Sequence, residues 1–188
     1  MRPVVLHTER FVLSVPTRAD ARAVFAACQD AELQRYTTVP VPYSVDDAAS
    51  FVGEFVPQAW RNGTEYVFGI RPDLDAPLMG VVSWQRARRA VGYWLGAEHR
   101  GHGVMTEAVR GLIDWIFTHD DFDVLHWEAY AGNVGSAIVA QRAGFRWSGE
   151  GLCSVVGRDG THPWGWLGEL HRRDLGTVQP REEWPVLA

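Results

Sequence analysis

Arginine, histidine and two glycines alternate over Arg100-Gly101-His102-Gly103, directly before a segment of helical periodicity. Apolar residues recurring at helical spacing predict one amphipathic helix over about residues 103 to 118: Val109, Leu112, Ile113, Ile116 and Phe117. Its N-terminus would lie at the glycines, where unpaired N–H groups and the helix dipole favour a phosphate or pyrophosphate. The glycines allow close approach, and Arg100 adds a permanent positive charge. The pattern therefore predicts an anion-binding loop.

Two common phosphate-binding motifs do not fit this loop. A P-loop needs Lys before Ser or Thr, whereas all 18 basic residues of the chain are Arg. A dinucleotide fingerprint needs a third Gly three residues after the second, where this chain has Thr106. The absence of Lys also excludes a pyridoxal-phosphate Schiff base and a lysine general base.

The elements that must position the loop alternate between strand and helix patterns, which predicts an α/β fold with some parallel pairing. Strands are expected at residues 6–15, 66–70, 78–85, 90–95, 124–130, 146–156 and 164–170. Besides the loop helix, helices are expected after capping residues Thr17, Ser44 and Asn133. The first should end near Asp30, and Pro57 should kink or end the second.

Length and composition predict one compact domain over residues 1–176 and a loosely ordered tail over 177–188. The net charge of −5 argues against a broad nucleic-acid surface. Cys28 and Cys153 are isolated, so neither a disulfide framework nor a metal site is expected. Without a signal segment or membrane-length apolar run, we expect a soluble, cytoplasmic protein that does not bind membranes.

Several short motifs together carry a family resemblance over about residues 6–170. The segment 100–105 resembles the (Gln/Arg)-x-x-Gly-x-(Gly/Ala) loop of the GCN5-related N-acetyltransferases (GNAT family), although Met105 departs from the usual small residue. Its Met-Thr-Glu-Ala continuation is similar to the ribosomal-protein N-terminal acetyltransferase (RimJ/RimL-like) branch. Asn133-Val-Gly-Ser136, Ala143-Gly-Phe145 and Gly149-Glu-Gly151 resemble later motifs of the family, in the same order.

The resemblance implies a mixed twisted sheet of about six to seven strands flanked by about four helices, with acetyl-CoA as cofactor. It implies that the backbone of Trp94 and Leu95 pairs with the pantetheine arm, where the strands at 90–95 and 124–130 splay apart. The implied pyrophosphate loop comprises Arg100, Gly101, His102, Gly103, Val104, Met105 and Thr106. Asn133 and Ser136 would contact the pantetheine and the thioester sulfur; the alternative for both is helix capping.

Acetyl transfer needs a neutral amine, a polarised carbonyl and a proton for the departing thiolate. Many relatives supply that proton from a Tyr four residues after the position of Ser136, where this chain has Ala140, so Ser136 is the nearest matching hydroxyl. Glu128 and His162 are candidate general bases, against surface or salt-bridge roles for both. A water chain is a further alternative. Glu107 is expected to be a structural anchor.

The resemblance implies an acetyl-CoA-dependent N-acetyltransferase acting on a primary amine, with a protein or peptide N-terminus ahead of a small-molecule amine. A non-catalytic acyl-CoA sensor is the alternative class. Acidic residues are dispersed along the sequence and predict no polyamine pocket. Arg86, Arg88 and Arg89 are expected at a solvated hairpin end or, alternatively, in an acidic-substrate patch. The nine Trp residues are expected in the core, in an acceptor pocket or at a homodimer contact.

Overall fold

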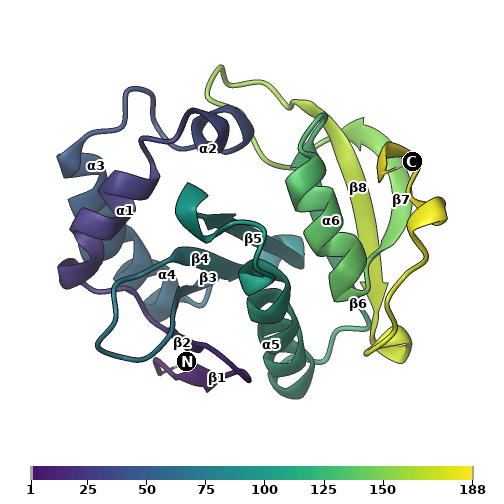
Figure 1. Cartoon of the computed structure of the whole chain (residues 1–188), viewed down its shortest axis with the longest axis horizontal. Coiled ribbons are helices and arrows are strands. Elements are labelled where there is room, and N and C mark those ends of the chain that lie inside the picture. Colours follow the sequence, from purple (N-terminus) through teal and green to yellow (C-terminus); the bar gives the residue numbers. More distant parts are fainter. Residues whose placement is uncertain (1, 188) are drawn as a thin grey trace.

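The computed structural model describes residues 2–187, so Met1 and Ala188 of the predicted domain and tail lie outside the described residues. One mixed sheet runs through the described chain in the order β1-β2-β3-β4-β5-β6-β8-β7 (Figure 1). Its strands are β1 (Leu6–His7), β2 (Val12–Ser14), β3 (Glu65–Arg71), β4 (Gly80–Gln85), β5 (Ala90–Leu95), β6 (Val124–Tyr130), β7 (Arg146–Leu152) and β8 (Trp164–His171). The α/β fold of the expected kind is confirmed, with eight described strands instead of six to seven.

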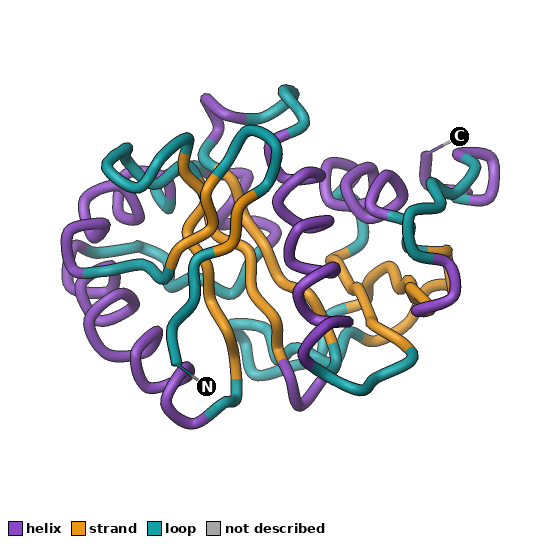
Figure 2. The backbone as a smooth tube through the Cα atoms, turned by 90° about the horizontal axis from the view of Figure 1, so that it is seen from below, coloured by secondary structure: helices purple, strands orange, loops and turns teal. Residues whose placement is uncertain are grey.

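The helices lie at the two ends and across the middle of the sheet. They are α1 (Ala21–Ala27), α2 (Ala31–Tyr36), α3 (Val45–Ser50), α4 (Val56–Asn62), α5 (Val104–His119) and α6 (Val134–Ala143). Helices α1, α2 and α3 gather at one end, whereas α6 lies beside β8 at the other and α5 runs between them (Figure 1). In the view from below, the strands fan out between these helical groups (Figure 2).

Strands β5 and β6 are the only parallel neighbours in the described sheet, and they pair at a single register position, Ala90 with His126. The N–H of His126 donates to the carbonyl of Arg89 at 2.7 Å. Beyond that point no register pair joins the two strands within residues 2–187. The sheet is therefore open between the C-terminal halves of β5 and β6, as the family resemblance implied.

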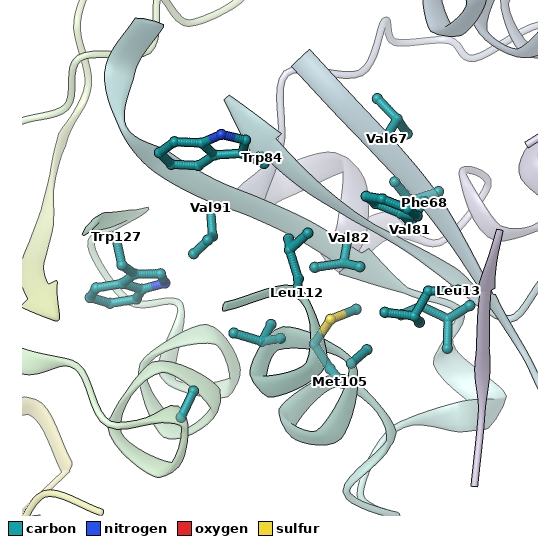
Figure 3. Close-up of a cluster of buried hydrophobic side chains, with 14 of the residues drawn as sticks. Leu13, Val67, Phe68, Val81, Val82, Trp84, Val91, Met105, Leu112 and Trp127 are labelled. Carbon is teal, nitrogen blue, oxygen red and sulfur yellow. The ribbon is translucent and has the colours of Figure 1, made fainter. Parts of the chain in front are cut away.

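Helix α5 holds the core against the sheet. Leu112 and Met105 point from the helix toward Val82 and Leu13, and all four are buried (Figure 3). Burying apolar area contributes about 25 cal/mol per Å² removed from water. Packing of the apolar face of α5 against the sheet therefore holds the helix, and the loop that precedes it, in position. The amphipathic helix predicted at 103–118 is confirmed within one residue at each end.

Local turn chemistry explains two departures from the expected elements. The strand expected at 6–15 is split into β1 and β2, because the N–H of Thr8 donates to the carbonyl of Phe11 in a tight turn. Helix α2 was missed because it has six residues and buries only Leu33, too little for a periodic signal. Asp30, expected near the end of the first helix, instead caps α2 by accepting from the N–H of Leu33.

The capping box at Thr17 and the N-cap at Ser44 are confirmed, and Ser44 also forms a capping box with Asp47. Pro57 neither ends nor interrupts the helical path. A π-helical turn, Phe51–Phe55, joins α3 to α4, and Pro57 lies in the first turn of α4. A proline ring clashes with the carbonyl four residues earlier in a regular helix. The wider turn provides a bulge at the place where that clash would arise.

The C-terminal segment is packed onto the body, which contradicts the expected loose tail. Trp184 is fully buried, and its ring lies 5.5 Å from Trp127 and 5.6 Å from Trp147. Gln141 Nε2 donates to the carbonyl of Gln179. Burial of the Trp184 ring among other tryptophan rings orders this C-terminal segment, which the sequence pattern did not predict. No helix within residues 2–187 is long and apolar enough to cross a membrane.

Glu107 is the structural anchor that the sequence predicted. It accepts hydrogen bonds from Thr8 Oγ1 at 2.6 Å, from the N–H of Arg10 at 2.7 Å and from Arg10 Nε at 2.6 Å. Burial disfavours the charged form, but the bonds from Thr8 and Arg10 outweigh it and hold the Glu107 pKa below its ordinary 4.5. The carboxylate thus joins the β1–β2 turn to the start of α5.

Glu107→Gln should lower the free energy of unfolding at pH 7 by about 1.5–3 kcal/mol, the usual contribution of a hydrogen bond to a charged group. Because the folded pKa is depressed, the stabilisation is present above pH 4.5 and is lost as the pH falls through the folded value. Urea unfolding at pH 7 and in acid should show the difference shrinking. A constant difference across that range would contradict the anchoring role of the charge.

Candidate active site

Two cavities meet at the open edge of β5. One, of about 480 Å³, lies between the start of α5, the start of α6 and β5, and we call it the loop cavity. The other, of about 630 Å³, lies between the α2–α4 segment and strands β3–β6, and we call it the acceptor cavity. Both are lined by four common residues, namely Tyr36, Thr37, Tyr93 and Trp94. A ligand in either cavity would therefore reach the same stretch of β5.

Side chains on β5 alternate between the two faces of the sheet. Tyr93 points toward α6, where its hydroxyl donates to the carbonyl of Ser136 at 2.9 Å. Trp94 pairs in register with Val81 and shares the opposite face with it. Tyr93 was not predicted as a site residue from the sequence. The signal that could have identified it is a polar aromatic residue on the strand beside the predicted splay.

The glycine loop forms an open backbone cradle. Gly101 and Gly103 have φ of +81° and +76°, a region that side-chain-bearing residues rarely adopt. The first helical hydrogen bond of α5 runs from the N–H of Glu107 to the carbonyl of Gly103, at 3.1 Å. The N–H groups of residues 104–106 therefore have no partner within the helix, and these residues line the loop cavity. This cradle fits a phosphate or pyrophosphate.

Arg100 is not the free cation that the sequence predicted. Its guanidinium pairs with Asp30 and, at 2.8 Å, with Glu32, and its Nε donates to the carbonyl of Leu95 at 3.2 Å. Burial disfavours ionisation of Asp30, but the Arg100 hydrogen bond and the N–H of Leu33 hold the Asp30 pKa below its ordinary value. Arg100 thus ties the loop to α2, a contact invisible in the sequence.

Arg142 of α6 is the arginine of the loop cavity that sequence reasoning missed. It lines the cavity and is exposed. Within residues 2–187, none of the recorded ion pairs involves Arg142. Arg142 lies at the C-terminal end of a short helix, 36 residues after Thr106, the last loop residue that lines the cavity, so no local motif identified it.

Backbone alternation decides which residues of β5 face the open edge. The N–H of Gly96 donates to the carbonyl of Met79 on the β4 side, so Trp94, two residues earlier, also pairs its backbone with β4. Tyr93 and Leu95 point their backbone groups the other way, toward the splay. Because the carbonyl of Leu95 already accepts from Arg100, its N–H is the group left to serve a ligand. The backbone role expected of Trp94 therefore moves to Tyr93.

Ser136 and Tyr93 form a small hydrogen-bond network. Ser136 Oγ accepts from Trp127 Nε1 at 3.1 Å and donates to the Tyr93 hydroxyl at 3.1 Å. Burial raises the Tyr93 pKa above its ordinary value, and bonds to Ser136 and Trp127 only partly oppose this. The phenol therefore keeps its proton near neutral pH. Asn133 caps α6 by accepting from the N–H of Ser136 at 3.1 Å, so its capping role is confirmed.

Glu128 lines the acceptor cavity but is heavily engaged. Its carboxylate pairs with Arg88 and accepts from the N–H groups of Ser154 and Val155 at 2.7 and 2.9 Å. Ser154 Oγ adds a further bond at 3.0 Å. Glu128 therefore joins β6 to the segment after β7, and its lone pairs are largely occupied. Its role as general base stays a prediction that this geometry does not favour.

The three arginines near residue 88 lie at the end of the β4–β5 hairpin, as expected, with Arg86 and Arg89 exposed, and each side chain has its own partner. Arg86 pairs with Asp120 at 3.0 Å, and Arg89 stacks over the Phe122 ring at 4.6 Å. Sequence proximity suggested a common role, whereas each side chain meets a different element. Only Arg88, with Glu128, lines the acceptor cavity.

His162 does not line either cavity. It is exposed, and its Nδ1 lies 2.8 Å from the carbonyl of Cys153. The hairpin turn that carries it extends outward, while Arg158 of the same turn reaches back to the carbonyls of Gln34, Thr37 and Val39. His162 as general base also stays a prediction that the placement does not favour.

Acidic residues that are dispersed in the sequence converge in the acceptor cavity. The carboxylates on its wall come from four separate segments: Asp47, Glu54, Glu65 and Glu128. Asp47 is used by the Ser44 cap and Glu128 by Arg88. The sequence did not reveal this convergence, because tertiary packing brings α3, the π-helical turn, β3 and β6 to one cavity. The expectation of no polyamine pocket stays a prediction.

The family model described as "Acetyltransferase (GNAT) domain" matches residues 10–146, which is most of the chain. A Bacillus subtilis (strain 168) protein named as an N-acetyltransferase, YjcK, is 34% identical over 113 residues. That alignment covers 57% of this chain and 62% of the relative, so the matched stretch spans less than two thirds of the relative.

Two solved structures illustrate the shared fold. The ribosomal L7/L12 alpha-N-protein acetyltransferase RimL, in complex with coenzyme A, superposes with a TM-score of 0.75 at 18% identity, covering 89% of this chain and 98% of that one. The microcin C7 self-immunity acetyltransferase MccE, in complex with acetyl-CoA and AMP, gives 0.74 at 21% identity, covering 87% and 93%. At these identities the likeness concerns the fold alone.

Proposed function

This chain belongs to the acetyltransferase (GNAT) family, and from that premise we propose that it transfers the acetyl group of acetyl-CoA to a primary amine. The observation that carries the proposal is the meeting of two cavities at the open edge of β5. One cavity has a backbone cradle for a pyrophosphate, and the other has an acid-lined wall that suits an amine. Tyr93 and Trp94 stand at the boundary between them.

The loop cavity has the donors that acetyl-CoA requires. The N–H groups of residues 104–106 would hold the pyrophosphate at the start of α5, with Arg142 as a cation at the rim. The backbone of Tyr93 would pair with the pantetheine arm. Asn133 would orient the first turn of α6 through its cap, and Ser136 of that turn lines the loop cavity.

Acetyl-CoA, when bound, supplies an acetyl thioester whose carbonyl carbon accepts the lone pair of the acceptor nitrogen. The N–H of Leu95 would donate to the carbonyl oxygen as it gains charge. Ser136 Oγ would release its proton to the departing sulfur and take the Tyr93 proton in exchange, because a hydroxyl can rotate between acceptors. Trp127 holds Ser136 Oγ in place for both exchanges.

The acceptor amine must lose one proton before or during attack, and a second as the amide forms. Glu128 is occupied by Arg88, Ser154 and Val155, so we assign both protons to water in the acceptor cavity, which is one of the sequence-based alternatives. The first proton of the amine goes to water, and the second passes through water to Tyr93, which has given its own proton to Ser136. Of the two protons that the nitrogen loses, one is thus released to water and one replaces the proton delivered to the sulfur.

We propose a peptide α-amine as the acceptor. RimL, named for α-N-acetylation of a ribosomal protein, shares this fold. The acceptor cavity, of about 630 Å³, is bounded by the end of α2 at Tyr36 and by the segment after β7 at Cys153 and Val155. A small polyamine is the second candidate, favoured by the carboxylates on the cavity wall.

Release of free thiol from acetyl-CoA in the presence of a panel of amines should test both the activity and the acceptor. We expect turnover with short peptides that have small first residues, and mass spectrometry should place the acetyl group on the α-amine. Exclusive modification of lysine side chains, polyamines or antibiotic amines would overturn the peptide assignment. Binding of acetyl-CoA without thiol release for any amine would instead favour the sensor alternative.

A further inference from the structure

The acceptor cavity has more negative charge than its own cations balance. Asp47 and Glu128 are engaged as described, but Glu54 and Glu65 have no basic side chain within salt-bridge distance among residues 2–187. Glu65 makes one long hydrogen bond, from Gln85 Nε2 at 3.4 Å. Two carboxylates therefore line the cavity without a basic partner and are available to a ligand cation.

Ser83 supplies a second, independent indication of a ligand. The residue is 4% exposed and lines the same cavity, and its hydroxyl makes no side-chain hydrogen bond among residues 2–187. A hydroxyl that faces a cavity without a protein partner can donate to or accept from a ligand. Its Oγ lies over Gly92, where an added Cβ would come within 3.1 Å of it and within 2.8 Å of Gln85 Nε2.

Strand register orders these groups on one face. Glu65 pairs with Gln85, and Ser83 pairs with Gly92, so the three polar side chains follow one another along adjacent strands. Trp94, at the boundary of the two cavities, pairs with Val81, four residues from Gln85. At about 3.3 Å per residue, Glu65 lies roughly 13 Å further along the sheet than Trp94. Between the two levels the wall is apolar at Val67 and Val81, apart from Ser83.

We propose that Glu65, with Ser83 and Gln85, forms a subsite for a second cationic group of the acceptor, an ammonium or guanidinium distant from the amine that is acetylated. This inference rests on the proposed function and defines its substrate class. Glu54 adds charge from the π-helical turn above the same wall. Two sources fit the chemistry: a peptide with a basic residue second or third from its N-terminus, and a long aliphatic diamine.

Calorimetric binding to the full chain in the presence of coenzyme A separates the subsite from catalysis. One arm compares Ser-Ala-Arg-Ala-amide with the same peptide carrying neutral citrulline in place of arginine. The other arm compares 1,8-diaminooctane with 1-aminooctane. We expect the wild type to prefer the charged member of at least one pair by about 10- to 100-fold, the range of a charge-assisted hydrogen bond.

Glu65→Gln should reduce that preference to within about threefold of unity, and Ser83→Ala should reduce it by a few-fold, as expected for loss of a neutral hydrogen bond. Glu182→Gln, an exposed carboxylate outside both cavities, is the matched control and should retain the full preference. The arm that shows the preference identifies the source of the cation.

Equal binding of both members in both arms by the wild type, or a preference that survives Glu65→Gln, would overturn the subsite. Failure of the proposed function has a different signature, namely no binding of acetyl-CoA or no thiol release with any amine. A wild type that acetylates the citrulline peptide as well as the arginine peptide would keep the function and refute the subsite.

Discussion

Replacing Gly103 by valine is expected to lower acetyl-CoA affinity on the order of 100-fold or more, while the protein stays folded. Gly103 is the residue before α5 and has φ of +76°, which valine adopts only with strain. The branched side chain would also stand where the first N–H groups of α5 must meet the pyrophosphate. Isothermal titration with acetyl-CoA, together with circular dichroism, measures both effects.

Gly176→Val is the matched control for that experiment. Gly176 has φ of +79°, almost the same backbone conformation, but it lies in the loop after β8 and lines neither cavity. An added Cβ there meets no atom within 4 Å. The control should therefore show a similar strain cost with unchanged affinity. Unchanged affinity in Gly103→Val would remove the loop from the cofactor site.

Removal of the Tyr93 hydroxyl in Tyr93→Phe is expected to lower turnover by about 10²- to 10³-fold, within the usual range for general-acid assistance. The ring packing is preserved, so acetyl-CoA affinity should change by less than threefold. Ser136→Ala should give a loss of similar size, because Ser136 Oγ and the Tyr93 hydroxyl are joined at 3.1 Å. Single-turnover kinetics on the chemical step provide the measurement.

The double variant gives the sharper test of a shared proton path. If the two hydroxyls act as one unit, Tyr93→Phe with Ser136→Ala should lose little more than the worse single variant. Independent roles would make the losses multiply. Tyr66→Phe, a buried tyrosine that lines neither cavity, is the control and should retain full turnover. Normal turnover in Tyr93→Phe would reduce Tyr93 to a packing residue.

The sequence predicted most elements that carry strong local signals. Helix α5 was placed within a residue at each end because five apolar positions recur at helical spacing, and the capping box at Thr17 has a fixed offset. The glycine loop was also predicted from a local pattern, because Gly101 and Gly103 directly precede the helical segment. Both glycines have positive φ in the structure. Short elements without periodicity, such as α2, gave no such signal.

The sequence by itself determined the family, the α/β fold and the position of the glycine loop before α5, because each depends on residues close together in the chain. Tertiary structure alone decided which charges are available: Arg100 is used by Asp30 and Glu32, and Glu128 by Arg88, although these partners lie 40 or more positions apart. It also decided that Tyr93 meets Ser136 and that Glu54 and Glu65 face one cavity with Ser83. Local patterns fix local geometry, whereas charge pairing and cavity lining depend on contacts between distant segments that no spacing rule encodes.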